Sequence, residues 1–99
     1  MAKIETGESV VIVLHSPREK LVGVLQEINA SGIFMRGVDL NYFEEWVRAI
    51  KNGETYLPMQ DHFFPMWRVE RISKDEGSSE LPSHAEIFND KTGYDFGEF

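Results

Sequence analysis

The feature that most constrains the fold is a series of short, β-branched segments in the first forty residues. They span residues 8–15, 20–29 and 33–40, and each is rich in Val, Ile or Leu. Segments of this length and composition are typical of strands, because they are too short to form stable helices. Pro17 and Gly32 mark short turns between them, and strands joined by short turns pair antiparallel. The sequence therefore predicts a three-stranded antiparallel meander.

The hydrophobic period changes after the third predicted strand. Apolar residues then recur at helical spacing, at Phe43, Trp46, Val47 and Ile50. Asn41 followed by Glu44 resembles a capping box at the start of this stripe. Asn52 followed by Gly53 is also a strong type I′ turn signal, so a β-hairpin is the alternative interpretation. We favour a helix over about residues 41–52, because the cap and the stripe agree on it.

Extended character returns over residues 56–72. Pro58 cannot donate a ladder hydrogen bond, so its strand should be an edge strand or be interrupted there. Pro65 should start a tight corner, after which apolar and charged side chains alternate over residues 68–72. The order of elements predicts an all-β fold for residues 1–76. We expect a small, five-stranded, strongly bent antiparallel barrel with one short helix inserted between strands 3 and 4.

The acidity of the chain is concentrated near its C-terminal end. Residues 1–73 hold 8 Lys or Arg and 10 Asp or Glu, whereas residues 74–99 hold 2 and 7. We expect residues 77–99 to be an acidic tail, disordered or docked on the body or on a second copy, in which Ser83 and Glu86 resemble a capping box. A nearly neutral body lacks the positive field of a non-specific nucleic-acid binder, so DNA is not an expected partner.

Membrane and secretion signals are not apparent in the sequence. The longest purely aliphatic run, residues 10–14, is far shorter than the roughly 20 residues that cross a bilayer. The first eight residues lack the apolar stretch of a secretion signal, and the chain has no cysteine for a disulfide framework. We expect a cytoplasmic protein without a membrane partner.

Catalytic and metal-binding patterns are weak. The three histidines are His15, His62 and His84, and no two of them stand at a His-x₃-His or similar metal-binding spacing. Asp61 precedes His62, but neighbours in a strand point to opposite faces. Asp75 and Glu76 form a carboxylate pair in what is expected to be a solvated linker, where neither pKa need be perturbed. We therefore expect no enzymatic activity, metal or cofactor, and leave open a small ligand in the barrel mouth.

Aromatic residues crowd one stretch of the chain, at Tyr42, Phe43, Trp46, Tyr56, Phe63, Phe64 and Trp67. Core packing accounts for most of them, but a body this small cannot comfortably bury them all. Exposed Trp and Tyr residues favour interfaces. We predict a contact patch made of Tyr42, Trp46, Phe63 and Trp67.

The residues also resemble the Sm-like (LSm) family of SH3-type small β-barrels, over about residues 8–76. In the first Sm motif a Val-x-Leu-type strand leads to Gly-x-Leu-x-x-apolar-Asp. Here Val11 and Val13 lead to Gly-Val-Leu-Gln-Glu-Ile-Asn at residues 23–29. Residues 63–72 resemble the strand, 3₁₀ corner and last strand of these barrels. The resemblance implies that Gly23 sits where the second strand bends, and that an exposed fourth strand pairs with a neighbour's fifth.

The sequence departs from the RNA-binding members of that family. They carry Asp-x-x-Met-Asn after the second strand, where this chain has Asn-Ala-Ser-Gly-Ile at residues 29–33. Their later Arg-Gly pair is replaced by Pro-Met-Trp at residues 65–67, and the Arg-Gly pair of this chain, Arg36 and Gly37, lies in the third strand. The family's uridine pocket is therefore not carried over, and Pro58 would interrupt fourth-strand pairing if it lies in that strand.

These observations favour a non-enzymatic, Sm-like interaction module that self-associates as a homo-oligomer through the aromatic patch. The alternative, implied by the resemblance, is RNA binding. In that case Arg36, Arg68 and Arg71 would contact the phosphates and an aromatic side chain would stack on a base.

Overall fold

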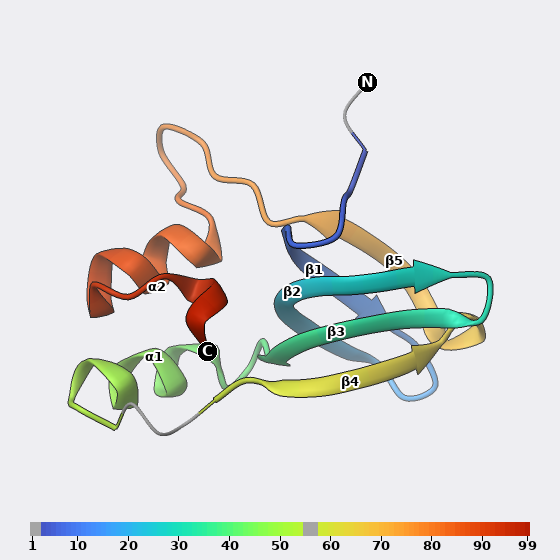
Figure 1. The fold of residues 1–99 in the computed structure, drawn as a ribbon, viewed down its shortest axis with the longest axis horizontal. Helices are drawn as coiled ribbons and strands as arrows, with labels where there is room; N and C mark the ends of the chain where they lie inside the picture. Colours follow the sequence, from blue (N-terminus) through green and yellow to red (C-terminus); the bar gives the residue numbers. More distant parts are fainter. Residues whose placement is uncertain (1–2, 55–57) are drawn as a thin grey trace.

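A single five-stranded antiparallel sheet forms the body of the chain. The computed structural model describes residues 3–54 and 58–99. The sheet has the spatial order β4-β3-β2-β1-β5 (Figure 1). Its strands are β1 (Ser9–Leu14), β2 (Glu19–Asn29), β3 (Gly32–Asp39), β4 (Gln60–Pro65) and β5 (Val69–Lys74). The predicted antiparallel meander is confirmed.

The two edges of the sheet, β4 and β5, differ from the barrel expectation. Within residues 3–54 and 58–99, β4 pairs with β3 and β5 pairs with β1, and no ladder joins β4 to β5. The sheet is therefore open, and the closed barrel is not seen. The predicted fourth strand began at Tyr56, which lies outside the described residues. Pro58 comes before β4 begins, so it does not interrupt this edge strand. β4 is an edge strand, which is one of the two outcomes expected for the strand near this proline.

A glycine pair allows the backbones of β2 and β3 to lie close together. Gly23 in β2 lies directly opposite Gly37 in β3. A Cβ atom on Gly23 would overlap the Arg36 carbonyl oxygen, and one on Gly37 would lie 2.5 Å from the Val22 carbonyl oxygen. Only residues without side chains permit this close approach of two backbones. Gly23 is therefore required where the backbones of β2 and β3 come close together, and the bend that the Sm-like resemblance implies at this position stays a prediction.

The two faces of the sheet bury two separate groups of side chains. The concave face holds Val10, Ile12, Leu14, Leu21, Leu25, Ile33, Met35 and Phe64. The opposite face holds Val22 and Val38, which are covered by side chains from the helices and the C-terminal segment, namely Phe43, Trp46, Val47, Ile50, Met59, Phe88 and Phe96. The alternation of β3, with Ile33 and Met35 on one side and Val38 on the other, follows the strand period.

Helix α1 (Phe43–Lys51) follows β3, so the helical interpretation of this segment holds rather than the hairpin. The predicted capping box is wrong. The N-cap is Tyr42, which makes no side-chain cap. The Asn41 N–H instead donates to Asp39 Oδ1 at 2.7 Å, which forms a tight turn just before the helix. The predicted apolar stripe is buried in full.

Residues 83–99 fold onto this helical side rather than extending away from the body. Helix α2 (His84–Thr92) begins at the predicted capping box, in which the Ser83 side chain accepts from the Glu86 N–H and the Glu86 carboxylate accepts from the Ser83 N–H. It ends at Gly93, which has a φ of 80°. A short 3₁₀ turn, η2 (Phe96–Glu98), completes the segment.

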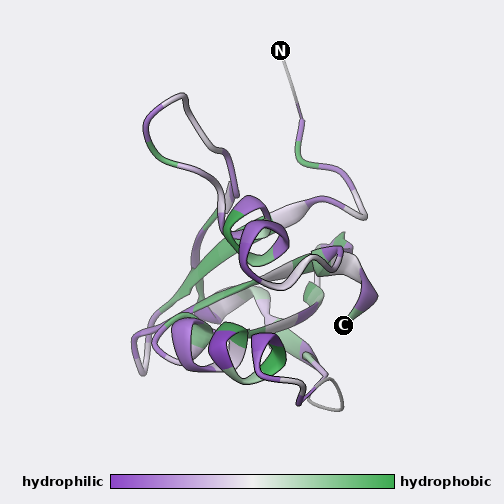
Figure 2. Ribbon diagram, turned by 90° about the vertical axis from the view of Figure 1, so that its left-hand side faces the viewer, coloured by the Kyte–Doolittle hydropathy of each residue, from purple (hydrophilic) through white to green (hydrophobic). Residues whose placement is uncertain are grey.

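The helices α1 and α2 lie together at one end of the sheet. The start of β3 and the end of β4 lie at the other end, away from the helices (Figure 1). Figure 2 looks onto this helical side, where hydrophilic and hydrophobic residues alternate along both helices. None of the helices in residues 3–54 and 58–99 combines the length and the apolar character that crossing a bilayer requires. The predicted corner is the 3₁₀ turn η1 (Met66–Arg68) between β4 and β5.

Candidate functional site

The predicted contact patch is not continuous, and Trp46 does not belong to it. This side chain is only 1% exposed. The Phe88 ring of α2 stacks on it with ring centroids 4.9 Å apart, and the rings of Phe96 and Phe99 meet it edge-on. The C-terminal segment therefore supplies the partners that bury Trp46, and the 26-residue aromatic stretch alone could not reveal them.

The other three predicted patch residues are exposed but separated. Tyr42 is 43% exposed and precedes α1, whereas Trp67 is 65% exposed in η1. These two elements lie at opposite ends of β4 (Figure 1). The Trp67 ring contacts His15, with centroids 6.4 Å apart, and Phe63 projects from the middle of β4. The structure thus brings none of these three rings into contact with another of them.

A different pair of rings does form an exposed surface. Phe34 in β3 and Phe63 in β4 are cross-strand partners, and their ring centroids are 4.7 Å apart. They are 40% and 46% exposed. The Phe63 ring also lies over Gly32, where a Cβ atom would come within 2.8 Å of it. We call Phe34 and Phe63 the bare ring pair. The sequence alone could not single out Phe34, since the β3–β4 register that pairs it with Phe63 is not a local signal.

The bare ring pair lies beside a free strand edge. In the described part of the chain, β4 pairs on one side with β3 and has no strand on its other side. Edge strands present unpaired N–H and C=O groups that can add a strand from another chain. The ring pair and the free edge therefore offer apolar area and backbone hydrogen bonds at one place.

Two of the three candidate phosphate-binding arginines are engaged within the chain. Arg36 donates from Nε to the backbone oxygen of Phe99 at 2.9 Å and from Nη1 to Asp61 Oδ1 at 3.0 Å. Arg68 donates from Nη2 to Glu19 Oε2 at 2.9 Å and to the Pro17 carbonyl at 2.9 Å. These two side chains are held in place by the fold.

Arg71 differs from the other two arginines. It is exposed on β5, opposite Val13 of β1. One exposed arginine does not make the basic groove that follows a nucleic-acid backbone.

The sequence predicted that Asp75 lies in a solvated acidic linker, and the structure differs. Its side chain is only 2% exposed, and it accepts hydrogen bonds from the Ser9 hydroxyl at 2.8 Å and from the His84 and Ala85 N–H groups at 2.8 and 3.0 Å. Burial raises the pKa of this carboxyl, but the hydrogen bonds from His84, Ala85 and Ser9 outweigh burial and hold the pKa below its ordinary value. Asp75 is thus a structural anchor that ties the start of α2 to the sheet.

The histidines do not converge on a common centre. His84 Nδ1 lies 2.9 Å from Asp75 Oδ1, His15 lies against Trp67, and the His62 ring stacks on Phe64 at 5.4 Å. Asp61 and His62 point to opposite faces, as the strand period predicts. Among residues 3–54 and 58–99, no three His, Asp or Glu side chains are grouped so that they could hold a metal ion.

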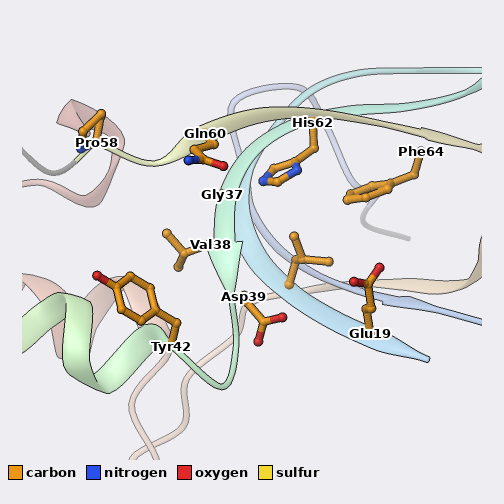
Figure 3. Close-up of a pocket in the computed structure, with 10 residues that line it drawn as sticks. Glu19, Gly37, Val38, Asp39, Tyr42, Pro58, Gln60, His62 and Phe64 are labelled. Carbon is orange, nitrogen blue, oxygen red and sulfur yellow. The ribbon is translucent and has the colours of Figure 1, made fainter. Parts of the chain in front are cut away.

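A pocket of about 330 Å³ opens on the concave side of the sheet. Its walls come from the start of β2, the end of β3, the residue before α1 and the edge strand β4. The lining residues are Glu19, Leu21, Gly37, Val38, Asp39, Tyr42, Pro58, Gln60, His62 and Phe64. Figure 3 shows His62 and Phe64 extending from β4 toward Glu19 and Asp39 on the opposite wall. The sequence left a ligand in the barrel mouth open but could not indicate these residues, because they lie far apart along the chain.

Comparisons of the chain with protein-family models, with curated proteins and with solved structures gave no significant match. Function therefore has to be inferred from the geometry above.

Proposed function

We propose that this chain is a non-catalytic interaction module that self-associates through the bare ring pair and the adjoining free edge of β4. The observation that carries the proposal is the exposed contact of Phe34 with Phe63, with centroids 4.7 Å apart, beyond the part of the sheet that the helices cover. Apolar rings that remain half exposed lower the free energy of association when a partner removes them from water.

The size of the ring pair argues that the edge strand takes part as well. Two half-exposed Phe side chains present roughly 200 Å² of surface, whereas a stable interface takes roughly 800 Å² from each partner. Backbone pairing along β4 would add area and hydrogen bonds next to the rings. A second copy of the chain is the natural partner, because most soluble oligomers are built from identical subunits.

The Sm-like resemblance is part of this proposal. It implies that the fourth strand of one chain pairs with the fifth strand of a neighbour. Two features support that reading: β4 and β5 are both edge strands in the described residues, and Pro58 lies outside β4. Gly23 and the 3₁₀ corner Met66–Arg68 are also what such a barrel requires.

RNA binding has weaker support than self-association. Arg36 and Arg68 already donate to partners inside the chain, which leaves Arg71 as the one exposed candidate of the three. An RNA strand would have to replace these internal hydrogen bonds before it gained phosphate contacts.

Sedimentation velocity from micromolar to millimolar concentration tests the proposal. The wild-type chain should associate as the concentration rises, and a double variant with Phe34→Ser and Phe63→Ser should remain monomeric. Leu81→Ser is the matched control, because Leu81 is 75% exposed in the segment between β5 and α2. Circular dichroism should show that all three proteins are folded. A wild-type chain that stays monomeric throughout, or a double variant that associates equally well, would refute the proposal.

A further inference from the structure

We propose that the concave pocket binds a guanidinium group, carried by an arginine side chain or a small arginine derivative. The pocket goes beyond the proposed self-association, because the bare ring pair and the pocket lie on opposite faces of the sheet. Phe63 projects to one face, whereas its neighbours His62 and Phe64 project to the other.

The pocket is concave and has an apolar floor. Leu21 and Phe64, which belong to the buried group of the concave face, are almost fully buried where they line it. Its volume of about 330 Å³ lies at the small end of ligand pockets. A single side chain or a fragment of similar size therefore fits it better than a nucleotide or a larger cofactor.

The polar groups of the pocket favour a cation. Two carboxylates, from Glu19 and Asp39, stand on one wall, and none of the ten lining residues is Lys or Arg. Arg18 and Lys20 border the same carboxylates from a neighbouring depression, not from inside the pocket. The ligand therefore meets carboxylates without an opposing positive charge from the lining itself.

The two carboxylates have different roles. Glu19 Oε2 accepts from Arg68 Nη2 at 2.9 Å, so its charge is largely compensated. Among the described residues, the Asp39 carboxylate accepts only the N–H of Asn41, at 2.7 Å on Oδ1, and forms no ion pair. The second oxygen of Asp39 is the acceptor that remains available to a cationic ligand.

The opposite wall favours a flat cation. The rings of His62 and Phe64 are stacked within 13° of parallel and extend toward the carboxylates (Figure 3). A guanidinium group is planar, donates a pair of parallel hydrogen bonds to a carboxylate, and stacks on aromatic faces. An ammonium group is compact and strongly hydrated, so it gains less from such a wall. The pocket should therefore prefer arginine to lysine.

A titration followed by ¹H–¹⁵N NMR tests this inference. The probe is Nα-acetylarginine methylamide, compared with the citrulline derivative, which has nearly the same shape but no charge, and with the lysine derivative. We expect shifts of the amides lining the pocket, with tighter binding of the arginine probe than of the other two. A blocked Gly-Arg-Gly peptide separates the two sources: tighter binding of the peptide indicates a protein ligand, and equal binding indicates a free small molecule.

Asp39→Asn keeps the acceptor for Asn41 and removes the charge. It should weaken binding of the arginine probe about tenfold, as expected for one charge-assisted hydrogen bond. Asp90→Asn, the same change at an exposed position on α2, should leave binding unchanged. Equal binding of the citrulline and arginine probes, unchanged affinity in Asp39→Asn, or the absence of shifts at the pocket would each overturn the inference. None of these outcomes bears on self-association, which sedimentation measures separately.

Discussion

One face of the sheet is covered at one end and bare at the other. At the covered end, Val38 lies under the helices, and Trp46 and Phe88 are stacked with centroids 4.9 Å apart. At the bare end, Phe34 and Phe63 form a similar ring contact, at 4.7 Å, but remain nearly half exposed. Both ends therefore hold a close contact between two aromatic rings. What differs is whether residues 83–99 reach them.

Arg36 stands at the boundary between these two ends. It follows Phe34 by two residues on the same face of β3, and its guanidinium holds the backbone oxygen of Phe99. Met59 donates its N–H to the same oxygen at 3.1 Å. The C-terminal segment is therefore anchored where the covered region stops.

A Phe→Ala substitution should lower the free energy of unfolding by very different amounts at the covered end and at the bare end. Phe88→Ala leaves a cavity at a fully buried site and should lower the free energy of unfolding by about 3–5 kcal/mol. Phe63→Ala should lower it by about 1 kcal/mol or less, because the ring is already half exposed. Urea unfolding at low protein concentration measures both. Equal losses would mean that the covered and bare ends do not differ as described.

Removing the anchor of α2 should have the next largest effect. Asp75→Ala takes away a buried carboxylate that accepts from Ser9, His84 and Ala85, and should cost about 2 kcal/mol of stability. Glu76→Ala, at the exposed neighbouring position, is the control and should cost less than about 0.5 kcal/mol.

The Asp75 contribution should also depend on pH. Its pKa is lowered in the folded state, so its stabilisation is complete above the ordinary Asp pKa and is lost as the pH falls through the folded-state value. The stability difference between wild type and Asp75→Ala should shrink as the pH falls below about pH 4. A difference that grows on acidification would contradict the lowered pKa.

Sequence patterns predicted the local elements of both ends well. The three meander strands, the stripe of α1, the corner at Met66–Arg68 and the Ser83–Glu86 capping box all depend on neighbours within a few residues. The same patterns could not separate Trp46 from Phe63. One is covered and the other is bare because of a segment some forty residues further along the chain.

The candidate sites needed the tertiary structure for the same reason. Phe34 meets Phe63 only through the β3–β4 register, and the pairing of the same two strands places Asp39 and His62 in one pocket. Asp75 looked like a solvated linker residue, because nothing local indicated that the start of α2 would return to it.

Removing the hydrogen bonds of Arg36, which lies between the covered end and the bare end, should lower stability by a smaller amount. Arg36→Met removes the hydrogen bonds to Phe99 and Asp61 but keeps most of the side-chain bulk, and should cost about 1 kcal/mol. Arg71→Met, at an exposed arginine, should change stability by less than about 0.5 kcal/mol. Amide hydrogen exchange should show faster exchange at residues 96–99 in the Arg36 variant alone. Unchanged exchange there would show that Arg36 does not hold the C-terminal segment.

The smallest effect is expected from RNA. With Arg36 and Arg68 engaged inside the chain, labelled oligouridine should show no change in fluorescence anisotropy at about 50 mM salt, where electrostatic binding is strong. Saturable binding that Arg71→Ala weakens would instead favour the RNA alternative and make the bare end of the sheet a base-stacking surface.

The most direct measurement is an isotope-filtered NOE experiment on a mixture of ¹³C-labelled and unlabelled chains at high concentration. If the bare end of the sheet is where two copies meet, intermolecular NOEs will reach the ring protons of Phe34 and Phe63, while the rings of Trp46 and Phe88 will show intramolecular NOEs alone. Intermolecular NOEs that avoid Phe34 and Phe63, or their complete absence at millimolar concentration, would contradict the account.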